Sequence, residues 1–107
     1  MIQTLCVAAV LLAWVSAASA QDSKETKELL QASGCMSCHA IDEKVVGPAF
    51  KAVAAKYAGQ ADAVDSLAQS VRNGSRGKWG RTPMPPHASL SNDDLKKLTT
   101  WVMSHKP

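Results

Sequence analysis

Apolar residues recur along most of this chain at intervals of three and four positions, which is the spacing of one helix face. The predicted helices are 24–33, 50–57, 61–73 and 91 to about 105. A glycine follows each of the first three segments, where it would end the helix, and Ser91 is placed to cap the fourth. No segment shows the alternation of a strand, so the sequence predicts an all-α fold.

The first twenty residues differ from the rest of the chain. Residues 5–15 form an apolar run that is too short to span a bilayer, and 18–20 (ASA) fits the small-residue pattern of signal-peptide cleavage. No Lys or Arg precedes the run, and retention as a membrane anchor is the alternative. We expect cleavage after Ala20, so that residues 1–20 are a signal peptide and residues 21–107 form one domain in the periplasm.

Composition narrows the class of protein further. Cleavage would remove Cys6 and leave Cys35 and Cys38 as the cysteines of the mature domain. A domain of this size buries little apolar area and usually needs an additional staple, such as a metal or a cofactor. The formal net charge of +3 is too mild for a nucleic-acid binder, and no basic stripe with interleaved aromatic residues occurs. These features favour a small exported domain that is stabilised by a bound group.

The chemistry of the chain is concentrated in the run Cys35-Met36-Ser37-Cys38-His39. Two thiols three positions apart, followed at once by a histidine, form the attachment signature of a c-type haem. The thiols would add to the two vinyl groups of one porphyrin, and the imidazole of His39 would reach the iron from the proximal side. A thioredoxin-like redox pair would need a strand–helix context, and a zinc site would need a second pair of ligands. A structural disulfide is the remaining alternative.

The segment 74–90 is the second informative stretch. Its three glycines and three prolines exclude a continuous helix, and a structureless segment of this length in a small domain is usually functional. Met84 lies between prolines that restrict the backbone on both sides of its thioether, which favours it as the second ligand of the iron. His87, three residues further on, is the competing ligand and would give a bis-histidine iron.

Five short motifs follow one another along nearly the whole chain after residue 20. They are CMSCHA at 35–40, VGPAF at 46–50, NGS at 73–75, WG at 79–80 and PMPP at 83–86. Their order and spacing resemble those of the short bacterial class I cytochromes c of the cytochrome c-551 type. The resemblance implies the class I cytochrome c fold, with about four short helices wrapped around one covalently bound haem c. It also implies that His39 and Met84 are the axial ligands.

The same resemblance implies roles for three residues beside the haem. The carbonyl of Pro48 would accept a hydrogen bond from Nδ1 of His39, which would fix the tautomer of the ligand. The indole of Trp79 would donate to a haem propionate, and Arg72 would neutralise the same group. A solvated place at a helix end is the alternative for Arg72. In one respect the chain departs from the family, which often has Asn where this sequence has His87.

A six-coordinate His/Met iron has no open position for a substrate, so one-electron transfer is expected rather than catalysis. The resemblance suggests a monomeric periplasmic shuttle that binds neither nucleic acid nor membrane. Its donor would be a cytochrome bc complex or a copper protein, and its acceptor a nitrite reductase, a terminal oxidase or a cytochrome c peroxidase. The alternative is a haem-based sensor of small ligands, or a weak peroxidase, in which Met84 is labile.

The expected docking surface surrounds the haem edge. An apolar rim would give weak, short-lived contacts, and basic residues around it would steer acidic partners. The apolar residues are Val45, Val46, Pro48, Pro85 and Pro86, and the basic residues are Lys44, Lys51, Lys78 and Arg81.

Overall fold

Helices make up most of the regular structure in this computed structural model, which describes the backbone of residues 15–107 and the side chains from residue 24 onward. The elements are α1 (Val15–Ala32), the short 3-10 helix η1 (Cys35–Ser37), α2 (Phe50–Tyr57), α3 (Ala63–Asn73) and α4 (Asn92–Met103). Within this part of the chain, β-structure is limited to two isolated bridges, so the predicted all-α class is confirmed.

The predicted helix boundaries agree best in the middle of the chain. Helix α2 has the predicted bounds, α3 begins two residues later than predicted, and α4 ends near the predicted place. The larger difference is α1, which begins at Val15 rather than at residue 24. Residues 15–23 (VSAASAQDS) contain three alanines and neither Gly nor Pro, so nothing in them stops a helix.

The predicted cleavage point after Ala20 falls inside α1. Most of the predicted apolar leader, including Cys6, lies outside the described residues. Among residues 15–107, no helix has the length and hydropathy needed to cross a membrane.

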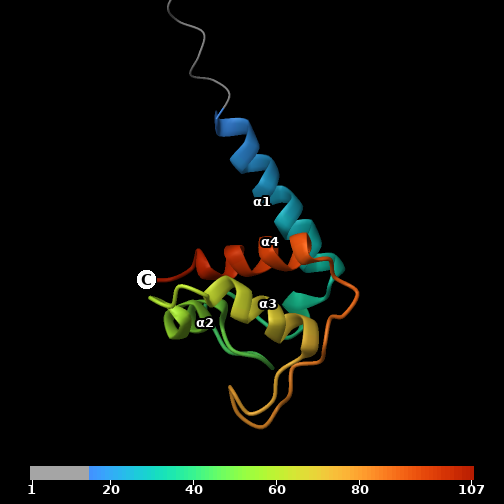
Figure 1. The fold of residues 1–107 in the computed structure, drawn as a ribbon, viewed down its shortest axis with the longest axis vertical. Coiled ribbons are helices and arrows are strands. Elements are labelled where there is room, and N and C mark those ends of the chain that lie inside the picture. Colours follow the sequence, from blue (N-terminus) through green and yellow to red (C-terminus); the bar gives the residue numbers. More distant parts are fainter. Residues whose placement is uncertain (1–14) are drawn as a thin grey trace, which may run out of the picture.

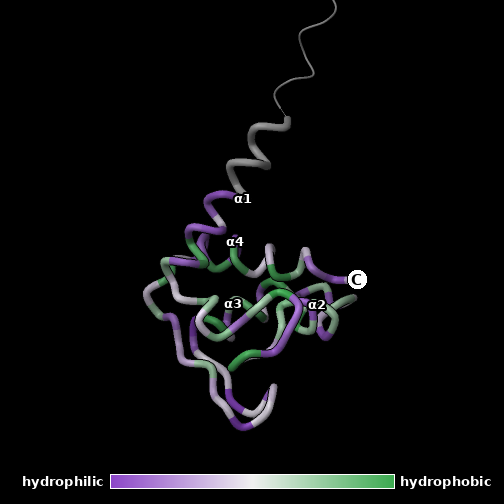
Figure 2. Tube along the Cα trace, turned by 180° about the vertical axis from the view of Figure 1, so that it is seen from behind, coloured by the Kyte–Doolittle hydropathy of each residue, from purple (hydrophilic) through white to green (hydrophobic). Residues whose placement is uncertain are grey.

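Helix α4 is the element against which α1, α2 and α3 all pack (Figure 1). Its buried residues Leu95, Leu98 and Val102 recur at helical spacing and face the other three helices. The hydroxyl of Thr99, also buried, donates to the carbonyl of Leu95 at 2.9 Å. In Figure 2 the hydrophobic stretches lie in the body formed by α2, α3 and α4, and the loop farthest from α1 is mostly polar or neutral. The helices therefore form a scaffold that leaves two loops to complete the interior.

The ends of the helices are determined by local sequence, as predicted. The backbone N–H of Asp94 donates to Oγ of Ser91 at 3.1 Å, which caps the first turn of α4. The glycines that follow α1, α2 and α3 all have positive φ angles. The chain therefore turns sharply after each of these helices, and two of the turns lead directly into the loops that carry the candidate ligands.

Candidate cofactor site

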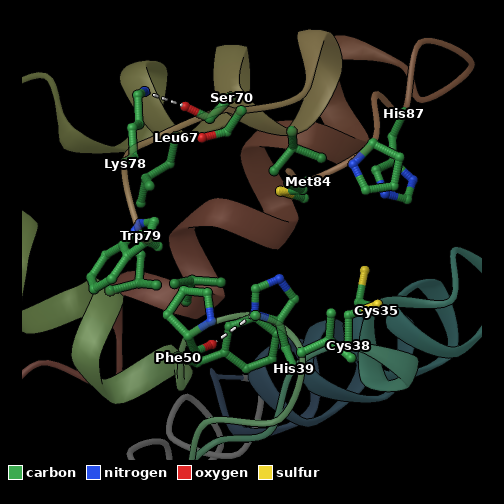
Figure 3. A pocket seen from close by; sticks show the side chains of 18 of the residues that line it. Cys35, Cys38, His39, Phe50, Leu67, Ser70, Lys78, Trp79, Met84 and His87 are labelled. Atoms are coloured by element: carbon green, nitrogen blue, oxygen red, sulfur yellow. Dashed lines mark hydrogen bonds between the residues drawn. The ribbon is translucent and has the colours of Figure 1, made fainter. Parts of the chain in front are cut away.

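A cavity of about 210 Å³ lies between the loop that follows η1 and the loop that precedes α4 (Figure 3). A void of this size is far larger than a packing defect, because a water molecule occupies only about 30 Å³ and native interiors contain few larger voids. Most of the lining is apolar: the loops supply the larger share of its residues, and α2, α3 and α4 add Phe50, Leu67 and Leu98 among others. The cavity therefore has the character of a binding site for a large apolar group.

The predicted attachment motif forms one wall of this cavity. Cys35 and Cys38 are free thiols, and both line the cavity beside the ring of His39 (Figure 3). The backbone carbonyl of Cys35 accepts hydrogen bonds from the N–H groups of Cys38 at 3.2 Å and His39 at 3.0 Å. This tight turn brings two sulfur atoms and one imidazole to the same side of the cavity, which is the arrangement needed to bind a porphyrin by its edge and its iron.

His39 is held by contacts to its ring. Its Nδ1 lies 2.7 Å from the carbonyl oxygen of Pro48, as predicted, and because a carbonyl only accepts, Nδ1 carries the proton. The other nitrogen, Nε2, therefore keeps its lone pair for a metal. Phe50 stacks against the imidazole with ring centroids 4.9 Å apart and planes 19° from parallel. A Cβ at Gly47 would lie 2.6 Å from Cε1 of His39, so this position leaves no room for a side chain.

The state of the thiols argues against the alternatives to haem attachment. Burial raises the pKa of the Cys35 thiol, and the neighbouring Cys38 raises it further, although a backbone hydrogen bond opposes the shift. Thiols in redox-active CxxC motifs have lowered pKa values, whereas the pKa of Cys35 is shifted in the opposite direction. In the part of the chain that the structure describes, no group of three or more Cys, His, Asp or Glu side chains could hold a metal ion. Neither a thioredoxin-like pair nor a zinc site fits.

Met84 reaches the opposite side of the cavity from His39 (Figure 3). Its backbone forms an isolated bridge with Ser75, in which Met84 N–H donates at 2.8 Å and Met84 C=O accepts at 3.0 Å. Gly74 adopts a φ of 79°, and a Cβ there would lie 2.6 Å from the carbonyl oxygen of Met84. His87 lines the same side, and its backbone N–H donates to the carbonyl of Val71 at 2.9 Å. The loop thus presents both predicted candidate ligands to the cavity.

A third edge of the cavity is polar. Trp79 lines it, and beside it Nζ of Lys78 donates to Oγ of Ser70 at 2.9 Å. Nζ of Lys56 lies 4.4 Å from the centroid of the Trp79 ring and donates to the carbonyl of Lys78 at 3.2 Å. One cation, Lys78, therefore lines this edge, and a second, Lys56, lies against the Trp79 ring behind it.

Arg72, which the resemblance predicts beside a haem propionate, does not line this edge. It is absent from the cavity lining, and its guanidinium donates to the side-chain oxygen of Asn92 at the start of α4. The residues that do line the cavity from α3 are Leu67, Ser70 and Val71, three and four positions apart. The helical periodicity of α3 was the sequence signal that could have identified Ser70 and excluded Arg72.

Two thiols and an imidazole on one wall, with a thioether facing them, define the site of a c-type haem protein. The Cytochrome c family model matches residues 23–106, and the chain belongs to this family. The family carries a single covalently attached haem c, and Cys35 and Cys38 fit its CxxCH motif. The fold and the relatives make the chain a short bacterial class I cytochrome c, a small electron-carrier protein.

Known bacterial cytochromes c are similar to this chain over most of its length. It is 52% identical over 84 residues to cytochrome c-551 of Pseudomonas aeruginosa, covering 78% of this chain and 80% of that protein. It is 40% identical over 103 residues to cytochrome c-552 of Nitrosomonas europaea, covering 96% of this chain and 93% of that protein. The crystal structure of wild-type Nitrosomonas europaea cytochrome c552 superimposes with a TM-score of 0.72 at 44% identity, covering 75% of this chain and 99% of that one.

Proposed function

We propose that this chain is a periplasmic one-electron carrier in which His39 and Met84 are the axial ligands of the haem iron. The observation that carries the proposal is that these two side chains face each other across one apolar cavity whose rim holds the attachment thiols (Figure 3). When bound, the haem supplies an iron that gains or loses one electron.

The residues around the cavity suit this reaction. The Pro48 hydrogen bond and the Phe50 stacking contact fix His39 in the orientation and tautomer of a ligand. The thioether of Met84 favours the reduced state and so raises the potential. The apolar lining excludes water. Because Ser75 bonds the Met84 backbone in both directions, the loop favours a closed sixth position over the labile one that a sensor or a peroxidase needs.

Trp79, Lys78 and Ser70 are proposed to hold the haem propionates at the polar edge. An indole N–H, a primary ammonium and a hydroxyl all donate hydrogen bonds, and Lys78 adds a compensating positive charge. Trp79 keeps the role that the sequence predicted for it. The basic role predicted for Arg72 passes to Lys78, because Lys78 lines the cavity.

Cleavage after Ala20 and export are supported by the extent of the family match. The family model begins at residue 23, and the aligned Nitrosomonas structure, covered to 99% of its length, spans 75% of this chain. Mass spectrometry of the protein isolated from the periplasm tests this proposal. A mature chain that begins at Gln21 and carries one haem is expected, and an intact chain in the membrane fraction would instead indicate an anchor.

Docking of redox partners is proposed at the exposed apolar rim. Val45 and Val46 are 53% and 50% exposed, which is unusual for large aliphatic side chains and suits brief contacts. Of the predicted basic residues, Lys51 pairs with Asp42 at 2.5 Å and Lys78 bonds Ser70, which leaves Lys44 and Arg81 for steering acidic partners. The proposed donors are a cytochrome bc complex or a copper protein, and the acceptors a nitrite reductase, a terminal oxidase or a peroxidase.

Stopped-flow reduction by candidate partners tests the docking proposal. The rate is expected to fall as ionic strength rises, because salt screens the attraction between Lys44 or Arg81 and an acidic partner. Lys44→Ala should reduce the rate at low salt, whereas Lys106→Ala, which removes an equal charge at the C-terminus, should not. A rate that does not change with salt would contradict the electrostatic part.

Absorption spectroscopy of the oxidised and reduced protein tests the ligation. The reduced protein is expected to show the α-band of haem c, and the oxidised protein the weak red charge-transfer band of a Met–iron bond. The reduced protein should not bind carbon monoxide rapidly. Haem c without the charge-transfer band would contradict Met84 ligation, and protein without covalent haem would contradict the whole proposal.

A further inference from the structure

His87 differs from the other two histidines of the chain in the hydrogen bonding of its ring. Nδ1 of His39 is bonded to the carbonyl of Pro48, and Nδ1 of His105 lies 2.9 Å from the carbonyl of Trp101. The ring of His87 has no hydrogen-bond partner among the residues that the structure describes, although it is partly buried and lines the cavity. Both of its nitrogens are therefore available to a ligand inside the cavity.

His87 also lies on the side of the cavity where Met84 lies, across from His39 (Figure 3). Three residues that line the cavity carry a nitrogen able to bind iron, namely His39, His87 and Lys78. His39 takes the proximal side, and Nζ of Lys78 is engaged by Ser70 at the polar edge. His87 is thus the unengaged nitrogen donor on the distal side.

We propose that His87 is a reserve axial ligand, which binds the haem iron from the distal side whenever the Met84 thioether is lost or displaced. The inference rests on the proposed His39 and Met84 ligation and extends it. In the exchange, the bond between the iron and the sulfur of Met84 breaks, and a bond from the iron to a ring nitrogen of His87 forms. A thioether and a neutral imidazole each donate one lone pair, so no electron or proton leaves the site.

The backbone of the loop permits this exchange without dismantling the helices. Met84 is anchored through Ser75, and His87 through its N–H bond to Val71 on α3, so the two residues have separate attachments. The link between them is Pro85-Pro86, whose residues have no N–H to donate. A shift of this link therefore breaks no amide hydrogen bond of its own. The ring of His87 can therefore turn toward the iron while its backbone keeps the bond to Val71 and α3 keeps its place.

The variant Met84→Ala, matured with haem in the full chain, tests the proposal by the spin state of its oxidised iron. We expect a six-coordinate low-spin iron with the spectrum of bis-histidine ligation, and loss of the Met–iron charge-transfer band. Met84→Ala/His87→Asn should instead be high-spin. If His87 occupies the iron of the single variant about nine tenths of the time, free imidazole should bind the double variant about tenfold more tightly. Met84→Ala/Lys78→Ala is the matched control and should remain low-spin.

Each outcome supports or overturns the inference. A high-spin Met84→Ala protein would show that His87 does not reach the iron. A double variant with His87→Asn that stays low-spin, paired with a Lys78→Ala control that becomes high-spin, would assign the reserve role to Lys78. If Met84 does not bind the iron in the wild-type protein, the wild-type spectrum would lack the charge-transfer band. This result distinguishes failure of the proposed Met84 ligation from failure of the His87 inference. Circular dichroism of each variant, matching the wild type, establishes that the fold has not changed.

Discussion

The two sides of the haem cavity hold their candidate ligands in different ways. On the proximal side, His39 is restrained through its ring, by the Pro48 carbonyl, by Phe50 and by the close approach of Gly47. On the distal side, Met84 is restrained through its backbone, and no hydrogen bond of its side chain is present in the described structure. The proximal ligand is therefore fixed through its side chain, whereas the distal one is fixed through its backbone.

Removing covalent attachment should have the largest effect, because it empties the cavity that both sides share. The cavity of about 210 Å³ would then lack the group that fills it, and a domain of this size has little other core to stabilise it. Cys35→Ala/Cys38→Ala is therefore expected to lose most of its helical circular dichroism at room temperature. Met36→Ala, which changes an exposed residue between the two thiols and keeps both of them, is the control and should be native. Full helix content in the double variant would contradict the expectation.

Gly74→Ala should have the next largest effect and should act on the distal side. The backbone of Gly74, with φ 79° and ψ 175°, lies in a region essentially restricted to glycine and costs another residue about 1–3 kcal/mol, and the clash with the Met84 carbonyl adds roughly 1–3 kcal/mol. Urea unfolding should show this loss, together with a weaker Met–iron band. Gly59→Ala has a similar φ of 82° in open space, so it should show the strain alone and keep the band. Equal losses in the two variants would mean that the Met84 contact is unimportant.

Gly47→Ala should affect the proximal side, by a smaller amount. Its Cβ would crowd the ring of His39, and overpacking of this kind costs about 1–3 kcal/mol. The proton on Nδ1 of His39 should exchange with solvent faster, as measured by NMR, because the bond to Pro48 lengthens. The Met–iron band should be retained. Val45→Ala, in the same loop but exposed, is the control and should change neither quantity. An unchanged exchange rate in Gly47→Ala would show that the ring has room to move.

Ser91→Ala should have the smallest effect and should leave both sides intact. It removes the oxygen that accepts from the N–H of Asp94 at the start of α4, for a loss of ~1 kcal/mol. The stability should fall without change in the Met–iron band or in the exchange of the His39 proton. A shift in either signal would show that the ligands depend on the helix scaffold as a whole, and not only on their own loops.

The sequence was sufficient to predict most of the fold because its signals are local. Glycine after each helix, Ser91 before α4 and the apolar spacing within α2 all act over a few residues, and the structure confirms them. The start of α1 was predicted too late, because the leader pattern at 18–20 was given more weight than the helix propensity of the same residues. Residues 18–20 therefore fit both a cleavage pattern and a helix, and the structure shows the helix.

The site was predictable where a motif carries its chemistry and less so where it depends on contacts distant in sequence. The thiols, His39 and Met84 could be identified from spacing, and the structure brings them to one cavity. The Ser75 bridge to Met84 could not, because it depends on how the loop folds back on itself. Arg72 was predicted beside a haem propionate from its place in the sequence alone. Helix α3 instead turns Leu67, Ser70 and Val71 toward the cavity, and the guanidinium of Arg72 donates to Asn92.

Trp79 and Trp101 give the mature domain an optical readout of its own. Trp79 lines the cavity, and Trp101 packs against Phe50 with ring centroids 5.2 Å apart and planes 82° apart, while Phe50 stacks in turn on His39. Because haem absorbs at the wavelengths where indoles emit, excitation at these positions passes to the haem, and the native protein should be nearly dark. Unfolding separates the indoles from the haem and restores their emission. Tryptophan fluorescence therefore reports the folding of this domain without an added dye.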